Sequence, residues 1–559
     1  MTQTSIKTLR DSAGMRWTAL LLLALAMFCS YVFMDILSPI KDLMESTRGW
    51  DSASFGRMQG AEVFLNVYVF FLIFAGIILD KMGVRFTAVL SGAVMLVGGI
   101  IKFYACSESF IGTGIEAWFT NHLNWDGDIP IIGTILPFAE GMPASAKLAA
   151  CGFMIFGCGC EMAGITVSRG IVKWFKGRET ALAMGSEMAL ARLGVATCMI
   201  FSPYFAKLGG EIHVDNAVKF GVVLLCIALI MFIVYFFMDK KLDAQTGEAE
   251  EKDDPFKLKD LGKIFTSLGF WLVALLCVLY YSAIFPFQKY AVNMLQCNLD
   301  LTAADPNTFW GGSSVTWIQY ILMLVVAAGS FSSNFMKTNK GLKYGLMGVA
   351  VVALIVYCYM GYMRGTAETI FAVFPLLAVA ITPILGNYVD HKGKAASMLM
   401  LGSILLVVCH LTFAFILPGV SAASSVGGVV VAYVTILVLG ASFSLVPAAL
   451  WPSVPKLVDE KILGSAYSAI FWIQNIGLGL FPALIGIVLE NSNANNAKVL
   501  AAKAAIEAGE EGTLVPYDYK WALVMLAALG IAALLISIYL KAVDKKKGYG
   551  LEEPNIKAE

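Results

Sequence analysis

Apolar runs long enough to cross a membrane recur along the whole chain. A transmembrane helix needs about 20 consecutive, mainly apolar residues. Only 14% of the 559 residues are charged and 58% are hydrophobic, whereas soluble domains average about 25% charged residues. The sequence therefore predicts an all-α polytopic membrane protein with about fourteen transmembrane helices. The expected helices cover residues 17–40, 57–79, 86–105, 146–169, 179–206, 218–238, 264–290, 310–335, 343–363, 369–389, 395–417, 428–450, 463–488 and 519–540.

The placement of lysine and arginine predicts the orientation of these helices. Every second connecting segment is rich in these residues, which is typical of cytoplasmic loops. We therefore expect both termini to be cytoplasmic. The longest highly charged stretch, residues 239–263, is expected to be a solvated cytoplasmic linker. It divides the chain into an N-terminal six-helix bundle, residues 1–238, and a C-terminal bundle, residues 264–559.

One turn pattern occurs twice, once in each half of the chain. In each copy an Asp follows the first Gly by four positions and a second Gly follows it by seven, with a basic residue shortly after. Glycines permit a tight turn, and basic residues stay at the inner surface. We predict two inner turns that carry conformational change, formed by Gly76, Asp80, Gly83 and Arg85 and by Gly386, Asp390, Gly393 and Lys394.

The paired turns resemble the signature of the major facilitator superfamily, in which it follows the second and eighth core helices. The resemblance implies two six-helix bundles around a central cavity that opens alternately to each side of the membrane. It makes 264–290 the seventh core helix and 369–389 the eighth. The runs 310–335 and 343–363 then form an extra helix pair, at about 310–363, inserted between core helices 7 and 8.

Ionisable residues interrupt two consecutive apolar runs, with Glu161 in the first and Glu187 and Arg192 in the second. A rise of 1.5 Å per residue puts Glu161 about 14 Å and Arg192 about 20 Å from the inner surface. A carboxylate and a guanidinium near the midplane suit the two ends of a zwitterion. The alternative is that Glu161 and Arg192 pair with each other and only fasten two helices. Ionisable residues inside membrane helices are usually functional.

Several short motifs are spread over most of the core helices. They are Glu161, Trp174-Phe175-Lys176-Gly177, Ala191-Arg192-Leu193-Gly194, Tyr280-Tyr281, Phe285-Pro286-Phe287, Leu450-Trp451-Pro452 and Gln474-Asn475-Ile476-Gly477-Leu478. In order and spacing these motifs resemble one branch of the superfamily, that of the lysosomal dipeptide uniporter and its prokaryotic relatives. The resemblance implies that Glu161 and Arg192 hold the amino and carboxyl ends of a peptide. The inserted helix pair and the long loop at residues 106–145 fall outside it.

Three further acidic residues are candidates for a gate or a proton-binding site. Asp35 lies near the outer end of the first expected helix and Glu62 near the outer start of the second. Glu187 is five residues, roughly 140° of helix, from Arg192. Because Glu187 need not face the same cavity, we expect it to be a partner for a neighbouring helix.

Residues of two other helices are candidates for contacts with the rest of the substrate. Tyr280, Tyr281 and Phe285 lie on the seventh core helix and could form a wall for peptide side chains, or simply pack. Gln474 and Asn475 lie on the eleventh core helix, where they could bond a peptide backbone or neighbouring helices.

No arrangement of residues indicates an enzyme, a metal site or a cofactor, and the net charge of zero does not indicate nucleic acid. The leading hypothesis is a secondary transporter that moves dipeptides or similar small zwitterions by alternating access. The E-x-x-E-R signature of proton-coupled peptide transporters is absent from the first helix, which favours uniport. The alternatives are an organic-anion exchanger, a proton-coupled peptide symporter, and a transport-inactive receptor or assembly subunit.

We expect the protein to lie in a lipid bilayer and to bind a small-molecule substrate. No obligate protein partner is expected, and a monomer is plausible. The chain contains no Asn-x-Ser/Thr sequon. A lumenal glycoprotein with long outer loops normally offers one. We therefore expect a prokaryotic cytoplasmic membrane.

Overall fold

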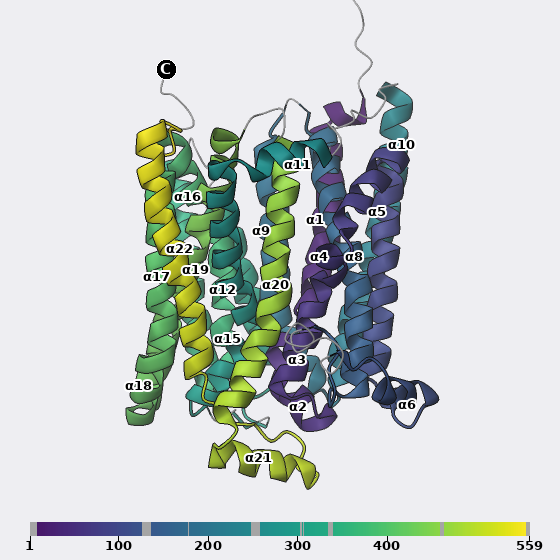
Figure 1. Ribbon diagram of the computed structural model, residues 1–559, viewed down its shortest axis with the longest axis vertical. Helices are drawn as coiled ribbons and strands as arrows, with labels where there is room; N and C mark the ends of the chain where they lie inside the picture. The colour runs from purple at the N-terminus through teal and green to yellow at the C-terminus, as the bar shows by residue number, and fades with distance from the viewer. Residues whose placement is uncertain are drawn as a thin grey trace, which may run out of the picture.

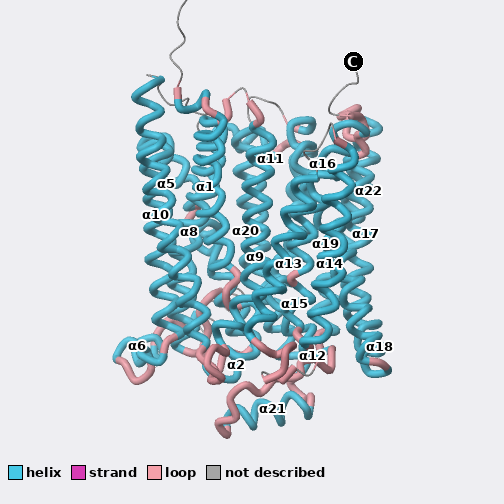
Figure 2. The backbone as a smooth tube through the Cα atoms, turned by 180° about the vertical axis from the view of Figure 1, so that it is seen from behind, coloured by secondary structure: helices cyan, strands magenta, loops and turns pink. Residues whose placement is uncertain are grey.

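The computed structural model describes residues 8–125, 136–176, 178–246, 258–301, 304–305, 307–333, 339–458 and 463–554. Within these ranges the chain forms helices and loops but no strands, and the long helices run side by side (Figures 1 and 2). The all-helical prediction is confirmed. A helix satisfies its own backbone hydrogen bonds, which is what a lipid environment requires.

The helices of the first half of the chain are α1 (Ala13–Met34), α2 (Lys41–Arg48), α3 (Ser52–Gly60), α4 (Phe64–Tyr68), α5 (Phe71–Cys106), α6 (Gly114–Asn121), α8 (Ala144–Trp174), α9 (Thr180–Ala206) and α10 (Val214–Thr246). Those of the second half are α11 (Leu258–Phe265), α12 (Leu268–Asn298), α13 (Ser313–Ser333), α14 (Lys340–Arg364), α15 (Ala367–Phe371), α16 (Val373–Lys392), α17 (Ala395–Leu411), α18 (Leu417–Ala423), α19 (Ser425–Leu457), α20 (Leu463–Asn493), α21 (Ala497–Glu507) and α22 (Lys520–Lys547).

Among the described residues, thirteen helices are long and apolar enough to cross a membrane. One of them, α5, is interrupted at Gly83, whose φ of 79° and ψ of 166° are not helical. The interruption divides the expected second and third spans, so the fold agrees with about fourteen transmembrane helices. The second span thus consists of α3, the short helix Ala61–Val63, α4 and the first part of α5.

Both signature turns contain a glycine with positive φ, at Gly83 and at Gly393. A side chain is rarely tolerated there, which explains why glycine is needed in each turn. In the first turn Asp80 accepts a hydrogen bond from Arg169 of α8 at 2.8 Å. Arg85 forms an ion pair with Asp243 of α10 at 3.3 Å.

The inserted helix pair is present as expected, because α13 and α14 lie between α12 and α16 in the chain and pack against each other. Arg364 at the end of α14 donates to Gln319 at 2.6 Å and to Thr316 at 2.9 Å, both on α13. α13 also contacts α16 and α9.

Three elements differ in extent from the sequence prediction. The expected charged linker begins as a continuation of α10 to Thr246 and ends in helix α11, while residues 247–257 lie outside the described part of the chain. The segment between the last two expected membrane helices, residues 489–518, contains helix α21 (Figure 1). α19 extends to Leu457 through three internal prolines.

Candidate functional site

A cavity of about 2620 Å³ lies between the two halves of the chain. Its walls come from α1, α4, α5, α8 and α9 of the first half and from α12, α16, α19 and α20 of the second. The lining includes Asp80 and Asp390 of the two signature turns, and also Glu161 and Arg192. The cavity therefore opens towards the end of the molecule at which both ends of the described chain lie (Figure 1).

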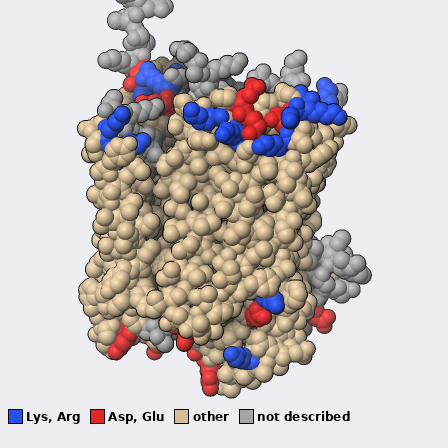
Figure 3. Space-filling view, turned by 90° about the vertical axis from the view of Figure 1, so that its left-hand side faces the viewer, with Lys and Arg blue, Asp and Glu red and all other residues tan. Residues whose placement is uncertain are grey.

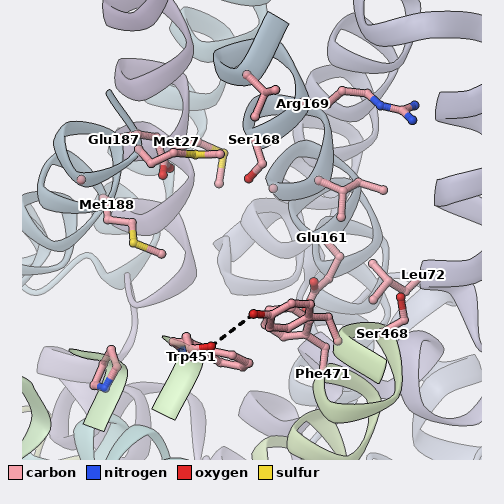
Figure 4. A pocket seen from close by; sticks show the side chains of 18 of the residues that line it. Met27, Leu72, Glu161, Ser168, Arg169, Glu187, Met188, Trp451, Ser468 and Phe471 are labelled. Carbon is pink, nitrogen blue, oxygen red and sulfur yellow. Dashed lines mark hydrogen bonds between the residues drawn. The ribbon is translucent and has the colours of Figure 1, made fainter. Parts of the chain in front are cut away.

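Glu161 faces this cavity from α8, as Figure 4 shows. Its Oε1 accepts a hydrogen bond from Asn475 Nδ2 of α20 at 3.2 Å. α8 itself packs closely on its neighbours through glycines, so that a Cβ at Gly157 would lie 1.9 Å from the carbonyl oxygen of Glu62. That close packing fixes the rotation of α8 and hence the direction of Glu161.

Arg192 faces the same cavity from α9, surrounded by aromatic rings. Its guanidinium carbon lies 5.0 Å from the ring centre of Phe443, 5.1 Å from that of Phe285 and 5.9 Å from that of Tyr31. Aromatic faces attract the cation without neutralising it. Among the described residues neither Glu161 nor Arg192 forms an ion pair, so the two do not fasten α8 to α9 as a salt bridge.

The two tyrosines of α12 point in different directions. Tyr281 lines the cavity, and its hydroxyl accepts from Trp451 Nε1 at 3.1 Å. Tyr280 does not line it: the side chain is buried, and its hydroxyl lies 2.7 Å from the carbonyl oxygen of Ser442 on α19. Consecutive helical residues are about 100° apart, so one helix face cannot present both rings to a substrate. The expected role of Tyr280 in substrate binding is therefore corrected to helix packing.

The two amides of α20 separate in the same way. Asn475 lines the cavity, whereas Gln474 is buried against α12, where its Oε1 accepts from Cys277 Sγ at 3.2 Å. Gln474 thus bonds a neighbouring helix, not the cavity. Phe285 does not line the cavity itself. It lies behind the lining, against Arg192 and the rings of Tyr281 and Phe443.

Glu187 lines the cavity together with Glu161 and Arg192, and Figure 4 shows it on the wall beside Met188 and Met27. The expectation that Glu187 serves a neighbouring helix is therefore corrected. α9 borders the cavity along several turns, so residues separated by 140° both reach it.

The end of the molecule opposite the chain termini, called the outer side below, is closed by contacts between the two halves. Asp35, after α1, accepts from Lys289 at 2.7 Å and from Gln288 at 2.7 Å, both on α12. Both members of the Asp35–Lys289 pair are buried. Sequence reasoning selected Asp35 but missed Lys289, although a lysine inside an apolar helix is itself a signal. Glu62 lies close enough to this pair to feel both charges, and its backbone carbonyl packs against Gly157 of α8.

A second cluster lies further out, at the outer mouth. The Tyr517 hydroxyl is 2.5 Å from Glu45 Oε1 and 2.6 Å from Glu490 Oε1. Burial and these two carboxylates raise the pKa of Tyr517 well above its ordinary value, so the hydroxyl stays a donor. Lys41 and Lys503 pair with Glu45 and Glu490 at 2.9 and 2.6 Å. These bonds hold α2 of the first half against α20 and α21 of the second.

A sequence profile described as the Major Facilitator Superfamily matches residues 23–367, which is more than half of the chain. The chain belongs to this superfamily. Membership places the chain in a superfamily of membrane transporters rather than in an enzyme family.

Several proteins named lysosomal dipeptide transporter MFSD1 are similar to this superfamily member. The zebrafish protein (Danio rerio) is 24% identical over 473 residues, covering 83% of this chain and 78% of its own length. The bovine protein (Bos taurus) is 24% identical over 367 residues, or 64% of this chain. The match spans only 62% of the bovine relative's length.

Two solved structures share the fold. A point mutant of the nucleoside transporter NupG superposes with a TM-score of 0.57 at 11% identity, covering 93% of this chain and 99% of its own. A structure titled for substrate recognition in proton dependent oligopeptide transporters gives a TM-score of 0.53 at 12% identity, covering 95% and 99%. At these identities the likeness concerns the fold alone.

Proposed function

We propose that this protein is a transporter of dipeptides or similar small zwitterions. One observation carries the proposal: Glu161 and Arg192 come from consecutive membrane helices, line the same cavity, and have no ionic partner among the described residues. Two unneutralised, opposite charges in one cavity are complementary to a molecule charged at both ends. The names of the similar proteins agree with this substrate class.

In this mechanism the substrate ammonium binds the carboxylate of Glu161. The side chain of Asn475, which now donates to Glu161, sits on the opposite half of the chain. Arg192 receives the substrate carboxylate through its planar, two-pronged guanidinium. The rings of Phe285 and Phe443 hold that guanidinium in place without consuming its hydrogen-bond donors.

Transport would proceed by alternating access of two bundles, residues 1–238 and 264–559. The cavity now opens towards the signature turns, while Asp35–Lys289 and the Tyr517 cluster close the other side. The opposite state requires these outer contacts to break. We infer uniport, because the first helix lacks the E-x-x-E-R signature.

We also propose that the open side is the cytoplasmic one. Figure 3 shows Lys and Arg gathered at the end of the molecule that carries the termini, which supports a cytoplasmic placement. The lack of an Asn-x-Ser/Thr sequon still favours a prokaryotic cytoplasmic membrane. The similar proteins, in contrast, are named lysosomal.

The test compares a dipeptide with two capped forms, one N-acetylated and one with an amidated carboxyl end. Wild-type protein should bind the free dipeptide at least about tenfold more tightly than either capped form, because each end loses a charge-assisted bond. Glu161→Gln should abolish the preference for the free amino end, and Arg192→Gln that for the free carboxyl end. Glu187→Gln is the matched control, a cavity carboxylate whose loss should leave the amino-end preference intact.

Two outcomes would reject this assignment. An organic-anion exchanger would keep or gain affinity when Glu161 becomes Gln, because only Arg192 anchors an anion. A proton symporter would concentrate the dipeptide in vesicles when an inward proton gradient is imposed, whereas a uniporter only equilibrates it.

A further inference from the structure

The second membrane span carries a buried amide with no hydrogen-bond partner at the wall of the cavity. Asn66 on α4 is 2% exposed. Neither its Oδ1 nor its Nδ2 has a partner among the residues that the structure describes. Buried polar groups are normally paired, since an unpaired one loses its bonds to water and gains none. Asn66 nevertheless belongs to the cavity lining.

The packing register puts Asn66 at the level of Glu161. Gly157 of α8 lies against the Glu62 carbonyl. The second span and α8 run in the same direction, from the outer closure towards the open side. Asn66 and Glu161 each follow that contact by four residues, so both lie about 6 Å, one helical turn, further inward.

The other neighbour of the second span, α20, gives the same level. Gly60 packs on the carbonyl of Gly479. Further inward, the carbonyl of Val67 accepts from Trp472 Nε1 at 2.9 Å. The two segments are therefore antiparallel, and Asn66 lies beside the turn of α20 that contains Asn475. Asn475 in turn bonds Glu161.

The second membrane span is interrupted one turn after Asn66, between α4 and α5. Phe70, between α4 and α5, has φ of 56°, a left-handed conformation that is unfavourable for a residue with a bulky side chain. Interrupted helices near the midplane form the binding sites of many transporters, because the break allows the backbone to move. Asn66 borders the cavity but is almost fully buried, so α4 has to move slightly for the amide to reach a substrate.

We propose that Asn66 binds the peptide group of the substrate, and thereby selects a peptide over other zwitterions of similar length. This rests on the proposed function above. A carboxamide offers one acceptor and two donors, which match the N–H and C=O of a peptide bond. In a dipeptide the peptide group is the first polar group after the ammonium, about one residue length away. With the ammonium on Glu161, the peptide group therefore lies next to Asn66.

The experiment measures the affinity of purified protein for a dipeptide and for an isostere in which a carbon–carbon double bond replaces the peptide bond. Both ligands keep their charged ends. Wild-type protein should bind the dipeptide about tenfold more tightly than the isostere. Asn66→Leu should lose this preference: its affinity for the dipeptide falls about tenfold, while that for the isostere stays as in wild type.

Gln59 provides a matched control. Its amide is also 2% exposed and without partners in the described part of the chain, but Gln59 does not line the cavity. Gln59→Leu should keep the wild-type preference for the dipeptide. Neither substitution should lower the melting temperature, because each removes an unpaired buried amide.

The outcomes separate this inference from the proposed function. If Asn66→Leu binds the dipeptide and still prefers it over the isostere about tenfold, the role of Asn66 is refuted while the function stands. If Gln59→Leu also loses the preference, then replacing any buried amide of the second span has this effect, and the inference fails. If wild-type protein binds neither ligand, the proposed function itself is wrong.

Discussion

Replacing Lys289 with Met should open the outer side of the transporter. Asp35 is 1% exposed and accepts hydrogen bonds from Lys289, Gln288 and Ser38 at 2.7, 2.7 and 3.3 Å. Without the ammonium, its negative charge is left buried in the outer-closed state but becomes hydrated in the outer-open one. Breaking a buried ion pair costs about 3–5 kcal/mol. Since about 1.4 kcal/mol is tenfold, the ratio of outer-open to outer-closed molecules should rise at least about a hundredfold.

A cysteine at Ser52 reports this shift. Ser52 is fully buried at the outer seam, and its hydroxyl has no partner among the described residues, so Ser52→Cys is a mild change. The half-buried native Cys297 near the same mouth is replaced with Ser to remove background labelling. A membrane-impermeant maleimide applied from the outer side of proteoliposomes should label the Lys289→Met protein about a hundredfold faster, because the rate follows the outer-open population.

The double variant Asp35→Asn with Lys289→Met is the control. It removes both charges of the pair, so neither Asp35 nor Lys289 leaves the other's charge without its partner, and labelling should return towards the wild-type rate. The reasoning is refuted if Lys289→Met is labelled at the wild-type rate. It is equally refuted if the double variant is labelled as fast as the single one, since the effect would not then come from the unpaired, buried charge of Asp35.

Other contacts give further predictions. Gly60→Ala would place a Cβ 2.2 Å from a carbonyl oxygen of α20, and should speed outer labelling and lower the melting temperature. Gly348→Ala on α14, where an added Cβ meets nothing within 4 Å, should change neither. Glu552 accepts from the Ser397 backbone and hydroxyl, both at 2.8 Å, so Glu552→Gln should cost about 1–2 kcal/mol and expose the C-terminal segment to protease; an unchanged cleavage rate would contradict this. Tyr517→Phe removes the hydroxyl that bridges the two glutamates of the outer mouth and should also speed outer labelling; wild-type labelling would show that the bridge does not close the mouth.

Much of the fold follows from local features of the sequence. Each membrane span satisfies its own backbone hydrogen bonds, so its presence depends on its own run of apolar residues. The inserted helix pair could be predicted for the same reason. The two turns could be predicted from their own glycines, Gly83 and Gly393. The importance of Glu161 and Arg192 also follows locally, because a charge inside an apolar run is costly wherever the helix packs.

The direction of each side chain, in contrast, depends on how the helices rotate and where they break, and this is set by packing between segments far apart in the chain. Tyr280 and Tyr281 are adjacent in sequence, yet only Tyr281 lines the cavity. Glu187 lines the cavity because several turns of α9 border it, and not only the turn that contains Arg192. The sequence by itself determined the membrane spans, the two turns and the choice of Glu161 and Arg192 as candidate binding residues. Only the tertiary structure decided which face each helix presents, and so revealed Lys289 at the outer closure and the unpaired amide of Asn66.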